Sequence, residues 1–185
     1  TYAYDRMNRL LEAVQDGKTE KYTYDLAGNR LKKESGRKTE IYEYNAKNQL
    51  TGIQSEEKTI QYRYDLQGNL LEELGRTWKK RYAYDAANRQ KDIELTRMSD
   101  GRAEYFHQSN CYDAEGLRYE TKENGKVIRF LFDRGELAEE LREDAHIRYT
   151  RGYDPLSLTW NGAEKSYFVP DEMGSTLFLL DKDHE

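Results

Sequence analysis

Few side chains in this sequence have the types and spacing that catalysis or metal binding requires. His107, His146 and His184 lie far apart, and none has a cysteine or second histidine at ligand spacing. The single cysteine, Cys111, is interpreted as a structural residue rather than a nucleophile. No serine-centred elbow, phosphate-binding loop or zinc signature is present. We therefore predict no catalytic residue, no metal ligand and no cofactor, and expect that the chain is not an enzyme.

Tyrosines and carboxylates are the abundant reactive groups, with 16 Tyr and 35 Asp plus Glu. Paired aromatic residues at regular spacing are also found in choline- and glucan-binding repeats, which build their binding cages from tryptophan. Here the only tryptophans are Trp78 and Trp160, and neither stands at a repeated position. The tyrosines are therefore interpreted first as packing and cross-strand stacking residues. A carbohydrate-binding surface of exposed tyrosines remains the alternative.

The tyrosines recur in a fixed pattern, Tyr-x-Tyr followed by Asp or Asn, which we call a cassette. Five cassettes follow one another with a strict 20-residue period. A fixed period of this length is typical of repeat architectures, in which the function belongs to the array. The proposed aromatic stripe comprises Tyr2, Tyr4, Tyr22, Tyr24, Tyr42, Tyr44, Tyr62, Tyr64, Tyr82 and Tyr84, with Tyr112, Phe130 and Phe132 from later, less regular cassettes.

The spacing inside a cassette predicts a β-strand. Two tyrosines separated by one residue point to one face of a strand, and the residue between them points to the other. That middle residue is small or charged, as at Ala3, Glu43 and Arg63. An aromatic face and a polar face are typical of a half-exposed antiparallel sheet, and the pattern lacks the three-and-four spacing of a helix.

A turn is predicted directly after each cassette, because Asp or Asn can open a turn and Gly or Asn can adopt the positive φ that closes it. The proposed turn residues are Asp5, Asn8, Asp25, Gly28, Asn45, Asn48, Asp65, Gly68, Asp85, Asn88, Asp113, Gly116, Asp171 and Gly174. The pattern predicts that the turns alternate between an Asp-x-x-Asn form and an Asp-x-x-Gly-Asn form that is longer by a single residue, which would make a 40-residue pair the structural unit. Further turns are expected on the way back to the next cassette, as at Asp16-Gly17 and Asn124-Gly125.

Two regions are predicted along the chain. Residues 1–95 hold the regular repeats, and residues 96–185 hold irregular ones in which the spacing drifts. In this second region Asn110 replaces the first tyrosine of a cassette, and further aromatic segments appear around Tyr153 and Tyr167. The fold expected from the whole pattern is all-β, an antiparallel meander of consecutive β-hairpins.

Composition excludes several classes of partner. The chain carries 30 Lys plus Arg against 35 Asp plus Glu, a net charge of −5, with the two signs interleaved. No basic stripe for nucleic acid is visible, and no apolar run approaches the roughly 20 residues of a membrane helix. A single open sheet leaves its terminal strands unpaired, so we expect the isolated chain to self-associate through edge strands.

The segment Tyr22 to Leu31, Tyr-Thr-Tyr-Asp-Leu-Ala-Gly-Asn-Arg-Leu, resembles the YD repeat of the Rhs proteins. Tyr112 to Arg118 is similar to late repeats of that family, and Asp171-Glu172-Met173-Gly174-Ser175-Thr176 resembles the segment before the Rhs-associated core. The resemblance covers nearly the whole chain. Members of the family include bacterial polymorphic toxins, the C component of Tc toxins and the teneurins.

The resemblance implies a repeat strip that curls as part of a spiral β-shell. It implies a non-catalytic module that encloses or presents a C-terminal toxin or effector polypeptide in a secreted or bacterial cell-surface protein. Its expected partners are the rest of its own shell and that toxin. The aspartate-based self-cleavage motif of the family is not matched, because Asp154-Pro155-Leu156-Ser157 lacks the required glycine and lies too early.

Overall fold

A computed structural model describes residues 1–15, 17–152, 154–171 and 174–181. Asp16, Tyr153, Glu172, Met173 and His184, which the sequence patterns include, lie outside the described residues. The chain divides into two compact units, Thr1–Phe106 and His107–Glu185, called unit 1 and unit 2. The boundary near residue 95 was expected from the regularity of the repeats and not from compactness. It stays a prediction.

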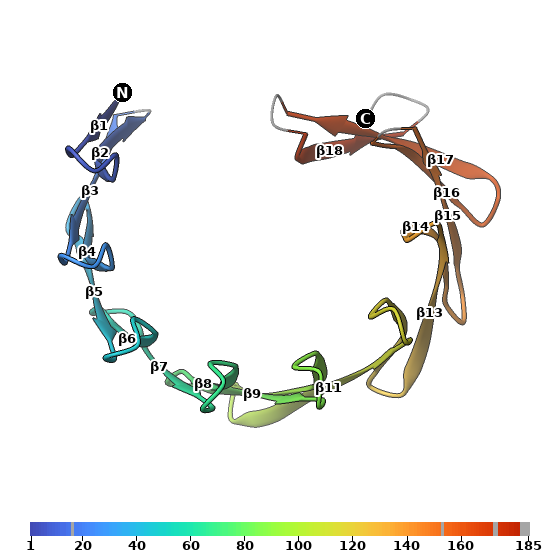
Figure 1. Ribbon diagram of the computed structural model, residues 1–185, viewed down its shortest axis with the longest axis horizontal. Coiled ribbons are helices and arrows are strands. Elements are labelled where there is room, and N and C mark those ends of the chain that lie inside the picture. The colour runs from blue at the N-terminus through green and yellow to red at the C-terminus, as the bar shows by residue number, and fades with distance from the viewer. Residues whose placement is uncertain (16, 153, 172–173, 182–185) are drawn as a thin grey trace. The chain divides into compact units, whose positions relative to one another are not determined.

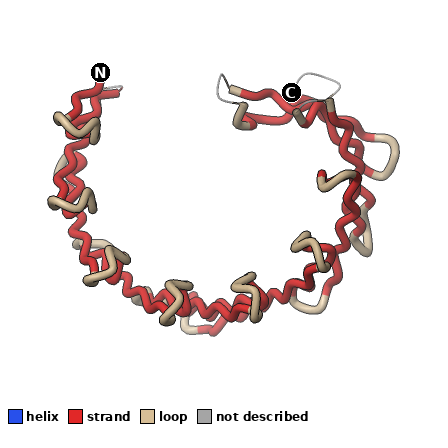
Figure 2. Tube along the Cα trace, in the orientation of Figure 1, coloured by secondary structure: helices blue, strands red, loops and turns tan. Residues whose placement is uncertain are grey.

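The described residues contain strands and turns and no helix (Figure 2). Unit 1 contains β1 to β10 and the start of β11, which continues into unit 2. The strands are β1 Tyr2–Tyr4, β2 Leu10–Gln15, β3 Lys18–Tyr24, β4 Arg30–Ser35, β5 Lys38–Tyr44, β6 Leu50–Gln54, β7 Thr59–Tyr64, β8 Leu70–Leu74, β9 Trp78–Tyr84, β10 Gln90–Ser99 and β11 Arg102–Tyr112. Unit 2 continues with β12 Arg118–Glu123, β13 Lys126–Asp133, β14 Glu136–Leu141, β15 His146–Arg151, β16 Pro155–Trp160, β17 Glu164–Pro170 and β18 Thr176–Leu180.

Within each unit the strands pair in chain order, each antiparallel to the one before it. In unit 1 the pairing runs without interruption from β1 to β10, and the strip curves as it proceeds (Figure 1). In unit 2 it runs from β11 to β18. The prediction of an all-β antiparallel meander of consecutive hairpins is confirmed.

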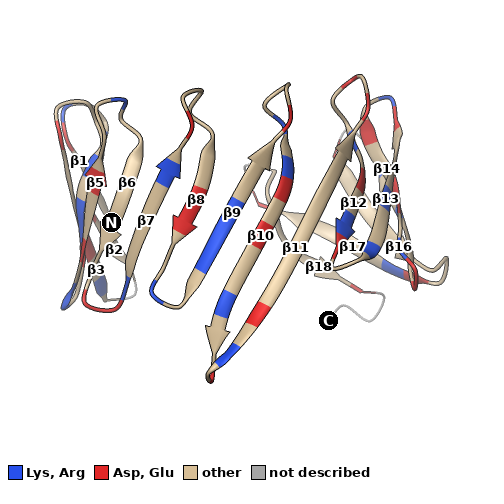
Figure 3. Ribbon diagram, turned by 90° about the horizontal axis from the view of Figure 1, so that it is seen from below, with Lys and Arg blue, Asp and Glu red and all other residues tan. Residues whose placement is uncertain are grey.

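The two kinds of turn in unit 1 lie at opposite ends of its strands. β7 and β9 point towards one edge of the strip and β8 points away from it (Figure 3). The turns that follow the cassettes therefore share one edge, called the cassette rim, and the other hairpin turns share the opposite rim. The single-layer strip buries few side chains fully: in unit 1 Tyr42 is the large apolar residue that is buried, at 6% exposure.

The expected difference in turn length is wrong. Tyr4 pairs with Leu10 and Tyr24 pairs with Arg30, so both hairpins use the same number of residues. The asparagine of the shorter-looking form occupies the same place as the glycine of the other: Asn8 has φ 60° and Gly28 has φ 93°. The residue after each, Arg9 or Asn29, closes the turn in both cases. The 20-residue register therefore passes through every turn unchanged.

A β-bulge recurs beside the cassette rim. In the first hairpin Ala3 pairs with Glu12 and Tyr4 with Leu10, which leaves Leu11 as an extra residue on the return strand. The same shift precedes the second tyrosine in the next repeats, as at Thr23/Tyr24, Glu43/Tyr44 and Arg63/Tyr64. Bulges bend a strand and increase its twist, so the bulge repeated in each hairpin contributes to the curvature of the strip.

Candidate functional site

The cassette turns are built around the side chain of the first turn residue. In the turn that follows Tyr24, Asp25 Oδ1 accepts the backbone N–H of Asn29 at 2.8 Å, and its Oδ2 accepts the side-chain amide of Asn29 at 2.8 Å. The backbone N–H of Gly28 donates to the Asp25 carbonyl. Asp65 makes the same bonds to Asn69. The carboxylate thus satisfies donors that the turn would otherwise leave to solvent.

The alternate turns use an arginine in place of the amide. Asp5 Oδ1 accepts the N–H groups of Met7 and Arg9, and Oδ2 accepts Arg9 Nε at 2.7 Å. Asp85 is bonded in the same way to Ala87 and Arg89. Asn45, which replaces Asp in the third repeat, still accepts N–H groups through Oδ1.

Hydrogen bonds hold the turn carboxylates in their ionised form. The backbone N–H of Arg9 lowers the pKa of Asp5, and the backbone N–H of Arg89 lowers the pKa of Asp85. The side-chain amide of Asn29 lowers the pKa of Asp25. These aspartates have the opposite property from a general acid, which needs a raised pKa to hold its proton near neutral pH.

The second tyrosine of each interior cassette forms a bond between repeats. Tyr24 Oη donates to the carbonyl of Leu10 at 2.8 Å, and Tyr64 Oη donates to the carbonyl of Leu50 at 2.8 Å. Tyr44 and Tyr84 donate in the same way to Arg30 and Leu70, each at 3.0 Å. The acceptor is always the first residue of the preceding return strand. Each hydroxyl therefore fastens one hairpin to the previous one.

The first tyrosine of the cassette donates instead to a carboxylate on the same face. Tyr22 Oη donates to Glu20, and Tyr42 Oη donates to Glu40, both at 2.5 Å. Lys33 and Lys58 complete these pairs through ion pairs to Glu20 and Glu40. Burial, and then the hydrogen bond to Glu40, raise the pKa of Tyr42 to about 12.

Arginines in or directly after the cassette turns lie over tyrosine rings. The Arg9 guanidinium lies 5.0 Å from the ring centre of Tyr24, and Arg30 lies 4.4 Å from that of Tyr42. These are cation–π distances. Tyr22, Tyr24 and Tyr44 are half-buried and Tyr42 is buried, whereas Tyr2 and Tyr4 of β1 are exposed.

Neighbouring turns of the cassette rim are also bonded to one another, in two alternating ways. Asn29 Nδ2 donates to Asn48 Oδ1 at 2.9 Å, and Asn69 Nδ2 donates to Asn88 Oδ1 at 3.0 Å. Between these contacts a cation reaches a backbone carbonyl: Arg9 Nη1 bonds Asp25 O at 2.8 Å, and Lys47 Nζ bonds Leu66 O at 3.3 Å. A 40-residue unit therefore exists in unit 1, although its basis is the bonding between turns rather than their length.

In unit 2 the aromatic stripe is partly replaced by polar residues. Asn110 occupies the place of a first tyrosine and is buried, and its Oδ1 accepts the hydroxyl of Thr121 at 2.9 Å. Phe130 is half-buried, and Arg118 lies 5.2 Å from its ring centre. Phe132 and Tyr112 are half-buried as well, while the residue between each pair of stripe positions, Cys111 or Leu131, is exposed.

The remaining predicted turn residues of unit 2 form similar turns. Asp113 Oδ1 accepts the N–H groups of Glu115 and Leu117, and Gly116 has φ 88°. Asp171 Oδ1 accepts the N–H of Ser175 at 2.8 Å, and Gly174 has φ 81°.

The histidines are not brought together. His146 contacts Glu139 at 2.8 Å, which lowers the pKa of that carboxyl, and Arg148 bonds the same glutamate. His107 lies in β11, where its backbone N–H donates to Asn124. Within the described residues no group of three His, Cys, Asp or Glu side chains is arranged to hold a metal ion. No helix in that part of the chain has the length and hydrophobicity to span a membrane.

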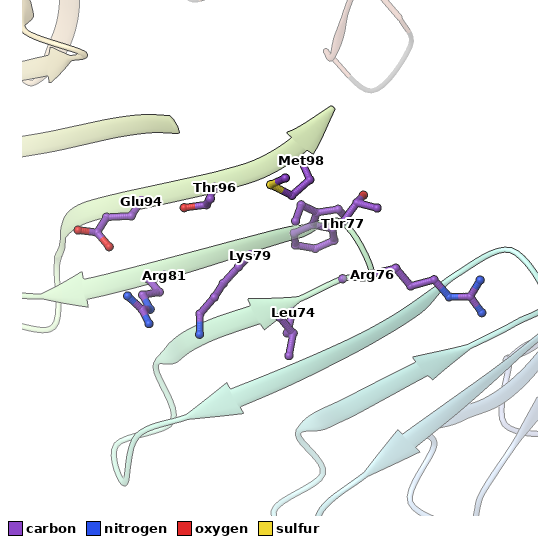
Figure 4. A pocket seen from close by; sticks show the side chains of 10 residues that line it. Leu74, Arg76, Thr77, Lys79, Arg81, Glu94, Thr96 and Met98 are labelled. Carbon is purple, nitrogen blue, oxygen red and sulfur yellow. The ribbon is translucent and has the colours of Figure 1, made fainter. Parts of the chain in front are cut away.

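One cavity of about 370 Å³ opens beside β8, β9 and β10 (Figure 4). Lys79 and Arg81 on β9 and Glu94, Thr96 and Met98 on β10 line it. Lys79 and Arg81 are already paired with Glu72, at 2.5 and 3.6 Å. The single carboxylate of Glu72 is thus shared by two of the cations at this cavity, and Glu94 is the acidic side chain among the lining residues.

The indole of Trp78, also at this cavity, lies directly against Gly75, where a Cβ atom would overlap it. The arrangement explains a glycine that does not have a positive φ. It provides packing at the opposite rim and presents no nucleophile or acid–base pair.

The repeated bonds described above are those of a scaffold, and comparison with known families agrees. The family model described as teneurin YD-shell matches residues 1–185. The chain belongs to the teneurin YD-shell family. The prediction of a YD-repeat protein is confirmed.

Two solved structures are similar to this YD-shell chain. One is a Tc holotoxin pore of Photorhabdus luminescens with a mutation in TccC3, at 13% identity, covering 100% of this chain and 14% of the other, with a TM-score of 0.37. The second is a crystal structure of TcdB2-TccC3-TEV, at 10% identity, covering 98% and 15%, with a TM-score of 0.38. The chain thus spans a small part of the length of either. No curated protein matches the sequence.

The bonds made by the tyrosine hydroxyls were not anticipated from the sequence. The 20-residue period indicated that tyrosines share a face, but a hydroxyl bond to a carbonyl of the preceding repeat depends on how two hairpins lie side by side. The acceptor is a backbone carbonyl, of Leu10, Arg30, Leu50 or Leu70, so no side-chain pattern indicated it.

Proposed function

We propose that this chain is a non-catalytic part of a β-shell, which encloses or presents a C-terminal toxin or effector polypeptide in a secreted or cell-surface protein. The single observation that supports this best is the match of the YD-shell family over the whole chain. The internal bonding agrees, because turn aspartates and cassette hydroxyls are committed to holding one hairpin against the next.

The proposed roles of the individual residues follow from their contacts. The cassette tyrosines join neighbouring hairpins, and the Asp, Asn and Gly residues of the turns fix the hairpin geometry. The hydroxyls of Tyr24, Tyr44, Tyr64 and Tyr84 and the carboxylates of Asp5, Asp25, Asp65 and Asp85 are all bonded within the sheet. The other expected partner is the rest of the same shell, which would continue the pairing at the outer edge of a terminal strand such as β1.

The test of enclosure uses the whole protein that carries this chain. It is purified, and intact mass and gel filtration show whether a C-terminal fragment is cleaved and still co-elutes with the repeats. Added protease then distinguishes an enclosed polypeptide, which resists digestion, from one bound outside. A single intact chain whose C-terminal polypeptide is digested at once would contradict the proposal.

The interior cassettes do not favour the carbohydrate alternative, because Tyr24 and Tyr44 are half-buried and their hydroxyls donate to backbone carbonyls. Glycan-array binding that is lost in Tyr24→Ala and Tyr64→Ala would support it. The expectation that isolated chains associate through edge strands stays a prediction.

A further inference from the structure

The side chains at the cavity beside β8, β9 and β10 are arranged in rows across the three strands. The row nearer the cassette rim is charged, and it consists of Glu72, Arg81 and Glu94. The next row consists of Leu74, Lys79 and Thr96. Met98 follows Thr96 on the same face of β10, because side chains two residues apart share a face (Figure 4). The cavity therefore has a charged end and an apolar end.

The charged end has more cations than Glu72 can neutralise. The Glu72 carboxylate is paired with Lys79 at 2.5 Å, with Arg81 at 3.6 Å and with Arg63 at 3.7 Å. One negative charge is thus shared among three positive ones, and two of the three cations line the cavity. The positive charge that remains favours an anionic group of a ligand at this place.

Glu94 adds a negative charge that the sheet does not use. It is half-buried in the cavity wall, across the strand pair from Arg81, whose Nε is directed to Glu72. Within the part of the chain that the structure describes, Glu94 forms no ion pair. A ligand with a negative charge alone would be repelled by Glu94, and one with a positive charge alone would be repelled by Lys79 and Arg81. The cavity fits a ligand that carries both charges.

The apolar end is exposed and in part held in place. Leu74 is 40% exposed and Met98 is 50% exposed. The Trp78 indole beside them is fixed between Gly75, which it contacts, and Lys80, whose Nζ lies 5.5 Å from the ring centre. A wall that is ordered before binding loses little entropy when a ligand arrives.

The dimensions of the cavity fit a small molecule. Its volume of about 370 Å³ lies within the range of small-ligand sites. Leu74 follows Glu72 by two residues, which is about 7 Å along a strand. The charged groups of a ligand and its apolar group must therefore be close neighbours in one compact molecule.

We propose that this cavity binds a free α-amino acid with a large apolar side chain. Its carboxylate contacts Lys79 and Arg81, and its ammonium group contacts Glu94. Its side chain lies against Leu74 and Met98. A free amino acid carries both charges on one carbon beside the apolar group, whereas a residue inside a peptide has neither charge on its backbone.

The charge requirement is tested with three ligands that share a phenyl ring. L-phenylalanine has both charges, 3-phenylpropionate lacks the ammonium group, and phenethylamine lacks the carboxylate. In calorimetric titrations of the full chain we expect L-phenylalanine to bind at one site, at least about fivefold more tightly than either analogue, which is the contribution of one exposed ion pair. Equal affinity for all three ligands, or no saturable binding of L-phenylalanine, would overturn the proposal.

Variants of the cavity assign the contacts. Glu94→Gln should remove the preference for L-phenylalanine over 3-phenylpropionate and keep the preference over phenethylamine. The matched control is Glu43→Gln, which changes an exposed glutamate of β5 outside the cavity and should leave all three affinities unchanged. A preference that persists in Glu94→Gln contradicts the assignment of the ammonium group.

Met98→Ser tests the apolar end independently. Met98 is an exposed residue, so circular dichroism should show an unchanged fold, and all three ligands should bind more weakly. Unchanged affinities in this variant would place the phenyl ring elsewhere and overturn the proposal. These titrations concern a small-molecule site alone, so their outcome is independent of whether the whole protein encloses a C-terminal polypeptide.

Discussion

At the scale of the residue, the turn aspartates combine a structural and an electrostatic role. Their oxygens accept two or more donors from the same turn, so the ionised form is stabilised on folding. Asn45 shows that an amide can replace the carboxylate as acceptor. The turn therefore needs an acceptor at this position, and the negative charge adds a dependence on pH.

We predict that acid destabilises the fold through these groups. The pKa values of Asp5, Asp25 and Asp85 are lowered on folding, so their stabilisation is complete above the ordinary Asp pKa and is lost as pH falls through the folded values. The free energy of unfolding, from urea titrations, should decrease below about pH 4. The triple variant Asp5→Asn, Asp25→Asn, Asp85→Asn should remain folded at pH 7 and show a shallower decrease. An unchanged slope would refute this account.

Alkaline pH acts on Tyr42 in the opposite direction. Its pKa is raised to about 12 in the fold, so the neutral phenol stabilises the native state at pH values below the ordinary Tyr pKa of 10.0, and this stabilisation is lost as pH rises towards 12. Denaturant titrations between pH 9 and 11.5 should show a smaller loss in Tyr42→Phe than in the parent. At pH 7 the variant should be less stable by about 1–2 kcal/mol, because Glu40 loses a hydrogen bond.

At the scale of the element, each hairpin is held by bonds to the previous hairpin as well as by its strand ladder. We predict that Tyr64→Phe, which removes the bond to the Leu50 carbonyl, lowers the free energy of unfolding by about 1 kcal/mol. Tyr4→Phe is the control, because Tyr4 lies exposed in β1 with no preceding hairpin in unit 1, and it should change stability little. The free energy of unfolding is measured by thermal and urea unfolding. If Tyr64→Phe and Tyr4→Phe lower it equally, the hydroxyl bond to the Leu50 carbonyl does not contribute to stability.

The opposite rim depends on one close approach. Gly75→Ala should destabilise the chain by about 1–3 kcal/mol, because the added methyl overlaps the Trp78 indole. In a Trp78→Ala background, Gly75→Ala should change the free energy of unfolding little. A double-mutant cycle measures this coupling between the two positions. If the penalty persists without the indole, the contact with Trp78 is not its cause.

The elements themselves were accessible to sequence reasoning, whereas contacts between them were not. Alternating exposure at Tyr22, Thr23 and Tyr24 follows from the two-residue period of a strand, so strands and their polar face could be predicted. The sequence suggests a difference in turn length because Gly28-Asn29 looks like an insertion relative to Asn8. In the structure Gly28 takes the place of Asn8, and Asn29 takes the place of Arg9. The bond of Asn29 to Asn48 requires two turns to lie side by side, which no local pattern encodes.

At the scale of the whole molecule, the strands of each unit pack against their neighbours in sequence, and the described residues form no further layer of helices. Stability in such proteins is approximately a sum of repeat terms and nearest-neighbour terms. Because the chain also clusters into two units, we predict that unfolding spreads over more than one transition. Hydrogen exchange followed by mass spectrometry should show β1 exchanging before β5. One sharp transition with uniform protection would contradict this expectation.

The alternation of bonds along the cassette rim sets the steps in which this chain can change length by recombination. Removing a single repeat, from Tyr22 to Ile41, keeps every strand in register but brings the turn of Arg9 beside that of Asn48, which are partners of different kinds. Removing two repeats, from Tyr22 to Gln61, brings Arg9 beside Asp65, whose turn is built like that of Asp25. Gene duplication or loss in pairs of repeats therefore conserves both the register and the rim, and selection on shell size would act most easily through even numbers of repeats.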